Sequence, residues 1–121
     1  MISLVVPFYN EEENIKPMYE LIVETFKDYK DKYEILFVND GSNDNTIERL
    51  REIVNSTKEE VRVIDFSRNF GKESAIYAGL KESKGDFVAL IDGDLQQDPK
   101  YVLEAVNFLK EKNIKNKDSF C

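Results

Sequence analysis

The chain has 121 residues and a mass of 14.1 kDa, which is enough for one domain or for part of a larger one. Hydrophobic residues make up 41% and charged residues 34%, so the composition favours a packed core over disorder. Lys and Arg number 17 against 24 Asp and Glu, and the formal charge of −7 argues against a nucleic-acid partner. The sequence contains no His, which excludes His-based acid–base catalysis, Ser-His triads and His-ligated metal sites.

The compartment is inferred from what the sequence lacks. The only cysteine, Cys121, is the last residue, so the chain cannot form an internal disulfide. Residues 1–14 carry no basic leader, and no run of 18 apolar residues occurs, so neither a targeting signal nor a transmembrane helix is expected. We therefore expect a cytoplasmic protein.

Apolar runs alternate with helical patterns along the chain. Continuous apolar runs predict strands at residues 2–7, 33–39, 61–66 and 86–91. Apolar residues three and four positions apart predict helices at residues 14–29, from about residue 45, at residues 72–83 and from residue 99. Asn10 and Glu13 match a capping box for the first helix, and Asp98 followed by Pro99 predicts the start of the last.

Each predicted helix has an apolar face that we expect to pack against the sheet. The first helix presents Ile15, Met18, Tyr19, Ile22, Val23 and Phe26. The next three present Ile47, Leu50, Ile53 and Val54; then Ile76, Gly79 and Leu80; then Val102, Ala105, Val106 and Leu109.

The order of elements predicts an α/β fold, with a mostly parallel sheet and helices on both faces. Near-continuous apolar strands agree with this, because parallel strands are covered on both sides. Four strands are few for such a sheet, and the pattern decays from Lys110 on. We therefore expect the chain to be the first part of a larger domain.

Acidic residues follow the fourth predicted strand, where open parallel sheets bind their ligands. Asp92 and Asp94 are two positions apart, so both carboxylates can face one cation, and Gly93 between them lets a ligand approach closely. With the amide oxygen of Gln96 they would form an oxygen site suited to Mg²⁺ or Mn²⁺, which could neutralise a diphosphate. The alternative is a solvated Asp-Gly turn, which the position of the motif opposite a second Asp turn makes less favourable.

Asp40 ends the second predicted strand, where an acid can accept hydrogen bonds from a ribose or a base. Alternatively, Asp40-Gly41-Ser42 is only a turn, with Asp44 capping the next helix. Tyr9 and Glu11 in the first loop could stack on a base and bind its donors, or else cover the core and stabilise a helix N-terminus.

Arg68 and Lys72 follow the third predicted strand and could contact phosphate. The alternative is that they are ordinary exposed basic residues.

Four segments resemble the glycosyltransferases of family 2, which have the GT-A fold. They are VVPFYNEEENI (5–15), YEILFVNDGSNDNT (33–46), FSRNFGKESAIYAGL (66–80) and GDFVALIDGDLQQDP (85–99). The last two most resemble bacterial polyprenyl-phosphate glycosyltransferases, including the bactoprenol glucosyltransferases, whereas dolichyl-phosphate mannosyltransferases are more distant. One departure is minor: the usual DLQDPP reads DLQQDP, with an extra Gln before Asp98.

The resemblance implies the Rossmann-like nucleotide-binding half of a GT-A domain and a metal-dependent, inverting hexosyltransferase. Its donor would be a nucleotide sugar, UDP-glucose rather than a GDP-sugar, and its acceptor a polyprenyl phosphate. The implied catalytic residues are Asp92 and Asp94, which with Gln96 are also the implied metal ligands. The expected nucleotide-sugar site comprises Pro7, Tyr9, Glu11, Asp40, Arg68, Lys72 and Asp92.

Family members continue well beyond this length, with an acceptor half and often transmembrane helices. We therefore expect residues 1–121 to be a truncated, N-terminal donor-binding part that binds a UDP-sugar weakly and transfers nothing alone. Membrane contact, at the cytoplasmic face, would come only through the missing C-terminal segments. Two alternatives stay open. The first is a non-catalytic nucleotide-binding remnant of the same fold. The second is a phosphoacceptor receiver domain, but such a domain needs paired acids at the end of its first strand, where this sequence has Pro7-Phe8-Tyr9.

Overall fold

A computed structural model describes residues 1–112 of the chain. The strands are β1 (Ile2–Phe8), β2 (Tyr33–Asn39), β3 (Val61–Asp65) and β4 (Phe87–Leu90). The helices are α1 (Glu12–Phe26), α2 (Thr46–Ser56), α3 (Lys72–Glu82) and α4 (Pro99–Glu111). Every predicted element is present, and α4 continues past Lys110, where the sequence pattern weakens; the rest of that predicted frayed end lies outside the described residues.

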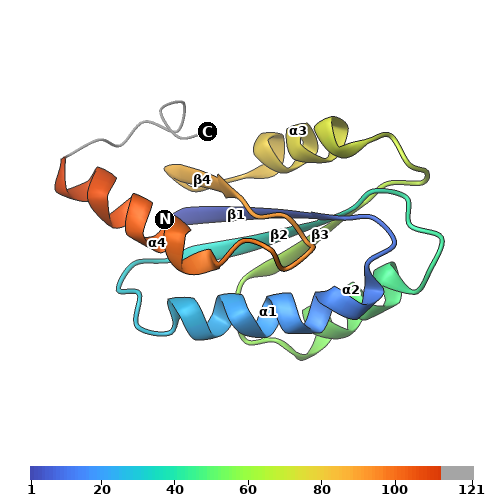
Figure 1. The fold of residues 1–121 in the computed structure, drawn as a ribbon, viewed down its shortest axis with the longest axis horizontal. Helices are drawn as coiled ribbons and strands as arrows, with labels where there is room; N and C mark the ends of the chain where they lie inside the picture. Colours follow the sequence, from blue (N-terminus) through green and yellow to red (C-terminus); the bar gives the residue numbers. More distant parts are fainter. Residues whose placement is uncertain (113–121) are drawn as a thin grey trace.

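The strands form one parallel sheet in the order β3-β2-β1-β4. Helix α3 packs on β1 and β2 from one face, whereas α1, α2 and α4 lie on the other (Figure 1). The predicted α/β class with helices on both faces is confirmed. None of the helices within residues 1–112 is long and apolar enough to cross a membrane.

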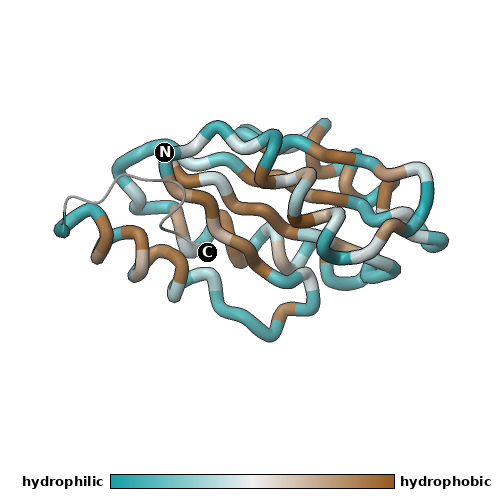
Figure 2. Tube along the Cα trace, turned by 90° about the horizontal axis from the view of Figure 1, so that it is seen from above, coloured by the Kyte–Doolittle hydropathy of each residue, from teal (hydrophilic) through white to brown (hydrophobic). Residues whose placement is uncertain are grey.

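The two central strands, β1 and β2, are the most buried strands of the sheet. All residues of β1 are buried, as are those of β2 after Tyr33, because both strands have a neighbour on each side and helices above and below. Figure 2 shows the hydrophobic colour running along these strands. The continuous apolar runs are therefore explained by burial on both faces.

Helix α3 approaches the sheet through small residues. Its buried residues are Ala75 and Gly79, and a Cβ atom added at Gly79 would lie 2.3 Å from Cγ1 of Val5. The prediction that Leu80 packs inward is wrong, since its side chain is 40% exposed. Val54 on α2, also predicted to face inward, is 38% exposed. Periodicity predicts which side of a helix is apolar, but it does not show how much of that side the sheet covers.

The predicted capping box at the start of α1 is also wrong. Asn10 has a positive φ of 51° and lies before the first helical turn. Its side-chain oxygen instead accepts a hydrogen bond from the backbone N–H of Asn43 at 2.7 Å, and its own N–H donates to Ser42 Oγ at 2.9 Å. Asn10 therefore joins the β1–α1 loop to the β2–α2 loop.

Asp44 and Asp98 stabilise helix N-termini. Asp44 accepts hydrogen bonds from the backbone N–H groups of Thr46 at 3.0 Å and Glu12 at 3.3 Å, so one carboxylate serves both α1 and α2. Asp98 accepts from Lys100 N at 3.0 Å with Pro99 in the first turn, which confirms the predicted start of α4.

A buried carboxylate, Glu34, lies near the amino ends of the strands, away from the loops that follow them. Its side chain is fully buried and accepts hydrogen bonds from Ser3 Oγ at 2.6 Å, Arg62 Nη2 at 2.9 Å and Lys84 N at 2.8 Å. Burial by itself would raise the pKa of Glu34, but the three hydrogen bonds and the Arg62 charge together lower it.

Because the folded-state pKa of Glu34 is below its ordinary value of 4.5, its contribution to stability is present above about pH 4.5. That contribution is lost as the pH falls through the folded-state pKa. We expect Glu34→Gln to lower the unfolding free energy at pH 7 by roughly 2 kcal/mol and to flatten its fall below pH 4.5. Urea unfolding at pH 7, 5 and 3.5 measures both effects. Glu24→Gln is the matched control, because Glu24 pairs with Lys27 on the exposed face of α1 and should behave like the wild type.

Candidate functional site

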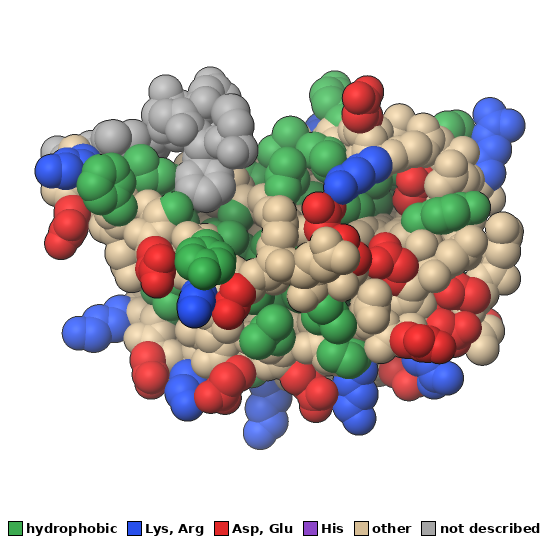
Figure 3. All heavy atoms as spheres, viewed as in Figure 1, with side chains coloured by type: hydrophobic (Ala, Val, Ile, Leu, Met, Phe, Trp, Pro, Cys, Tyr) green, Lys and Arg blue, Asp and Glu red, His purple; other side chains and the backbone are tan. Residues whose placement is uncertain are grey.

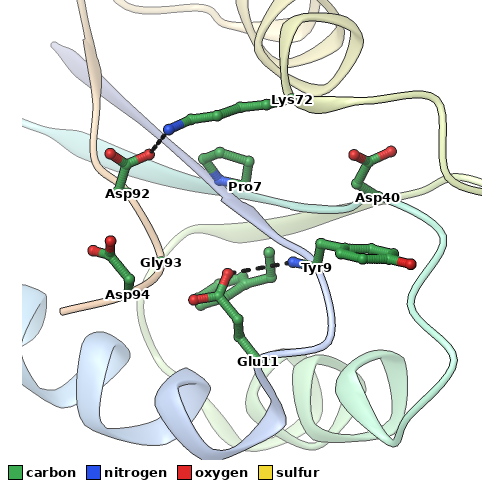
Figure 4. A pocket seen from close by; sticks show the side chains of 9 residues that line it. Pro7, Tyr9, Glu11, Asp40, Lys72, Asp92, Gly93 and Asp94 are labelled. Carbon is green, nitrogen blue, oxygen red and sulfur yellow. Dashed lines mark hydrogen bonds and ion pairs between the residues drawn. The ribbon is translucent and has the colours of Figure 1, made fainter.

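An open pocket lies beyond the carboxyl ends of the strands. It is lined by Pro7, Phe8, Tyr9, Glu11, Asp40, Lys72, Asp92, Gly93 and Asp94. Strand β1 lies between β2 and β4, so the loops after those two strands face each other across it. Asp40 and Asp94 therefore line the same pocket, as expected from the sequence (Figure 4).

Asp40 is held in place by the loop between β3 and α3. Its residue is 3% exposed, and its backbone N–H donates to Phe8 O at 2.9 Å. One carboxylate oxygen accepts from Phe70 N at 2.9 Å, and the other accepts from Asn69 Nδ2 at 3.1 Å. Asn69 was not predicted as a site residue, and only its place in the loop after the third strand could have suggested it.

Gly41 allows the two loops to touch. Its φ is +65°, and a Cβ atom there would lie 2.0 Å from the carbonyl carbon of Arg68. Both the backbone conformation and the space require glycine. The tight turn at Gly41, directly after β2, is therefore required for the contact between Asp40 and Asn69.

Tyr9 and Glu11 form the part of the pocket that comes from the first loop. Tyr9 is 43% exposed and lies on the same side of the pocket as Asp40 (Figure 4), so its ring does not simply cover the core. The Glu11 carboxylate accepts weak hydrogen bonds from Tyr9 N and Asn14 Nδ2, both at 3.4 Å. Glu11 precedes the first residue of α1 without capping it by its side chain.

Asp92 and Asp94 lie on the opposite side of the pocket (Figure 4). Asp92 forms an ion pair with Lys72, and Asp94 is exposed and accepts from Gln96 N at 3.0 Å. The prediction that Gly93 leaves room for a ligand misses the main reason for this glycine. A Cβ atom there would lie 2.5 Å from Cδ1 of Phe8, so Gly93 is needed where the loop packs on β1.

Two of the predicted site residues are not among those that line the pocket. Gln96 is exposed, and only its backbone N–H contacts Asp94. Gln97, which was not predicted, instead accepts a hydrogen bond from Asp92 N at 3.3 Å. Arg68 is exposed, and its guanidinium lies over the Phe70 ring at 4.9 Å from the ring centre.

The pocket is strongly acidic. Glu11, Asp40, Asp92 and Asp94 line it together with a single basic residue, Lys72. Figure 3 shows acidic side chains gathered on the side of the molecule where the strands end. A diphosphate would be repelled here unless a cation accompanied it.

The residues present fit a divalent cation that takes part of its ligands from a phosphate. Within residues 1–112, no group of three or more His, Cys, Asp or Glu side chains is close enough to hold a metal on its own. Mg²⁺ characteristically uses one or two carboxylates and completes its shell with water and substrate phosphates. Asp92 and Asp94, both facing one pocket, match that donor set.

The parallel sheet with its acidic pocket defines an α/β protein with a candidate binding site at the carboxyl ends of its strands. Residues 3–115 match the family model described as glycosyl transferase family 2, and the chain belongs to that family. This finding rules out the receiver-domain alternative.

Several curated relatives cover almost all of the chain. It is 47% identical over 109 residues to the uncharacterized glycosyltransferase YkcC of Bacillus subtilis, covering 90% of this chain and 33% of that protein. It is 35% identical over 113 residues to the dodecaprenyl-phosphate galacturonate synthase of Rhizobium johnstonii, covering 93% of this chain and 33% of that one. The chain therefore spans about a third of the length of these relatives.

Solved structures share the fold. The mannosyltransferase PcManGT of Pyrobaculum calidifontis, in complex with GDP-Man and Mn²⁺, has a TM-score of 0.78 at 24% identity; the match covers 89% of this chain and 32% of that one. The glucosyl-3-phosphoglycerate synthase of Mycobacterium tuberculosis, in complex with Mn²⁺, UDP and phosphoglyceric acid, has a TM-score of 0.66 at 27% identity; the match covers 90% and 38%. The predicted GT-A fold is thus confirmed.

We expect Gly41→Ala to lower the unfolding free energy by roughly 3 kcal/mol, because the added methyl group meets the Arg68 backbone and the φ is unfavourable. Gly71→Ala is the comparison, since Gly71 also has a positive φ, of 102°, but no atom lies within 4 Å of an added Cβ. Gly71→Ala shows what backbone strain costs without a clash, and denaturant unfolding measures both losses. A loss for Gly41→Ala of under about 1 kcal/mol, no more than its φ alone would cost, would contradict the packing of these two loops.

Proposed function

We propose that this chain is the donor-binding part of a glycosyltransferase that moves a sugar from a nucleotide-sugar donor to a polyprenyl phosphate. One observation carries the proposal: Asp40, from the end of β2, and Asp92 and Asp94, from the end of β4, line one pocket. Two relatives support the choice of acceptor by their names: the dodecaprenyl-phosphate galacturonate synthase of Rhizobium johnstonii and the undecaprenyl-phosphate 4-deoxy-4-formamido-L-arabinose transferase of Proteus mirabilis.

In this proposal the nucleoside lies against Asp40, Tyr9, Glu11 and Pro7. The Asp40 carboxylate is fixed by Asn69 and Phe70, and each of its oxygens keeps a lone pair for a ribose or base donor. The half-exposed Tyr9 ring offers a surface on which a base can stack. Arg68, which does not line the pocket, could reach the donor only by leaving its contact with Phe70.

The diphosphate lies toward Asp92 and Asp94, which together with Gln96 would hold Mg²⁺ or Mn²⁺. Gln96 would have to turn its side chain toward the pocket to take part. The ion supplies positive charge next to the departing nucleoside diphosphate, which is the main electrostatic demand of the reaction. The complexes of the two structural neighbours contain Mn²⁺, which supports a divalent cation as part of the proposal.

The proposed transfer requires no general base from this chain. A phosphate oxygen of the acceptor, already anionic at neutral pH, forms the new bond to the anomeric carbon. The bond from that carbon to the diphosphate breaks, and the nucleoside diphosphate leaves with the electron pair. Attack opposite the leaving group inverts the anomeric centre, and no proton is transferred.

The donor proposed is a UDP-sugar, with glucose as the sugar, because the sequence resembles the bactoprenol glucosyltransferases. The structural neighbours include complexes with UDP and with GDP-Man, so both nucleotides belong in the test. We propose that transfer takes place at the cytoplasmic face of a membrane, where the lipid acceptor lies. Parts of such an enzyme beyond these residues would bind that acceptor, so the chain alone is expected to bind donor without transferring sugar.

A non-catalytic nucleotide-binding module is the second candidate. The same pocket favours it, since Asp40, Asp92 and Asp94 could bind a nucleotide without any sugar transfer. The two candidates share the donor pocket, so a binding experiment tests what is common to both.

We expect calorimetric titration of the chain with UDP to show binding that is at least tenfold tighter with Mn²⁺ than without it. Asp94→Ala should abolish the difference made by Mn²⁺, because one of the two carboxylates that face the ion is gone. Titration with GDP under the same conditions decides the base preference.

Asp28→Ala is the matched control, since Asp28 is exposed beyond the end of α1 and does not line the pocket. It should keep the full effect of Mn²⁺. If Asp94→Ala also kept it, the metal assignment would fail; if the wild type bound neither UDP nor GDP, the proposed function would fail.

We expect Asn69→Ala to weaken UDP binding roughly tenfold, because Asp40 loses the amide that orients it. The affinity for Mn²⁺ alone should not change, since Asn69 contacts only the nucleoside side. Asn55→Ala, at an exposed position of α2, is the control. Equal UDP affinities in the two variants would mean that Asn69 does not position Asp40 for the nucleoside.

A further inference from the structure

Lys72 reaches across the pocket to Asp92. It is the first residue of α3, and its ammonium group pairs with Asp92 Oδ1 in the loop after β4 (Figure 4). The Lys72 side chain is 59% exposed and that of Asp92 33% exposed, so the pair lies at the mouth of the pocket. The pair joins the start of α3 to the loop after β4, 20 residues further along the sequence.

The stability of the helix does not explain this lysine. A positive charge in the first turn of a helix is unfavourable, because the N-terminus already carries the positive end of the helix dipole. Exposed ion pairs contribute little to folding. The position of Lys72 therefore points to the pocket that it faces.

The charges of that pocket explain the position of Lys72. Its ammonium group forms an ion pair with Asp92, and Asp94 and Glu11 line the same pocket. Lys72 is also the single basic residue among the four acids that line the pocket. In the absence of any other cation, it is the group that balances them.

The same position conflicts with a metal ion. A divalent cation at Asp92 and Asp94 would compete with the ammonium group for Asp92 Oδ1, and the two positive charges would repel each other. The backbone of Lys72 is held by α3, but its long, exposed side chain can move to a second partner. A diphosphate would offer that partner, because its oxygens accept hydrogen bonds from ammonium groups.

We propose that Lys72 is an internal counter-ion of Asp92 that a divalent cation must displace, so that the cation binds weakly until a diphosphate takes over the lysine. This inference rests on the proposed function, because it assumes that Asp92 and Asp94 hold the cation. It adds a coupling between the two ligands: each binds better when the other is present, since the cation frees Lys72 and the diphosphate receives it.

The contacts of the β3–α3 loop extend this coupling to the nucleoside side. Asn69 and Phe70 bond to Asp40, and Lys72, two residues further on, bonds to Asp92. One short segment therefore contacts the acids on both sides of the pocket. When Lys72 changes its partner, the change therefore takes place next to Asn69 and Phe70, which hold Asp40.

The test uses the chain with Mn²⁺ alone and then with UDP. Free Mn²⁺ is measured by electron paramagnetic resonance in titrations of the wild type, Lys72→Met and Lys81→Met. We expect Lys72→Met to bind Mn²⁺ roughly threefold to tenfold more tightly than the wild type, because a competing positive charge is removed. The same variant should bind UDP more weakly in the presence of saturating Mn²⁺, so the two affinities move in opposite directions.

Lys81→Met is the matched control, since it removes the same charge from the last turn of α3, away from the pocket. It should leave both affinities unchanged. An Mn²⁺ affinity of Lys72→Met that is equal to or below that of the wild type, including the absence of binding in both, overturns the inference. The proposed function is judged separately, by whether the wild-type chain binds UDP or GDP.

Discussion

The position of β1 between β2 and β4 is the constraint on which the rest of the site depends. Parallel strands end at the same edge of a sheet, so the loops that follow β2 and β4 meet across the end of β1. Phe8 and the following loop form the floor between them, against which Gly93 packs and to which Asp40 bonds. Asp40, Asp92 and Asp94 therefore share a pocket although they are far apart in the sequence.

Gathering acids at one edge has an electrostatic cost, and the structure reduces it in two ways. Buried Asp40 is satisfied by the Asn69 amide and the Phe70 N–H, whereas Asp92 is paired with the Lys72 ammonium. At the amino ends of the strands, the buried carboxylate of Glu34 is likewise stabilised by three hydrogen-bond donors. The difference is one of access: Glu34 is closed to solvent, but Asp92 and Asp94 open onto a pocket, where a ligand can replace the internal partner.

Local sequence patterns were sufficient for the elements and insufficient for their contacts. Apolar runs predicted the four strands because a strand buried on both faces contains few polar residues, and Asp98-Pro99 predicted α4 because a helix start is a local event. The capping box failed for the opposite reason, since Asn10 bonds to Ser42 and Asn43 in another loop. Leu80 was misplaced because the small residues Ala75 and Gly79 let α3 lie closely on the sheet, and a period in hydrophobicity does not show which residues a neighbour covers.

The sequence by itself determined the alternation of strands and helices, the acids at the strand ends and the membership of a family, since all of these are contained in the order of residues along the chain. The tertiary structure decided which of those residues act together. It placed Lys72 on Asp92 and Asn69 on Asp40, turned Arg68 onto Phe70, and left the side chain of Gln96 outside the pocket lining. The physical reason is that such contacts depend on how loops from different strands pack against one another, and that packing is fixed by the order of strands in the sheet rather than by any local pattern.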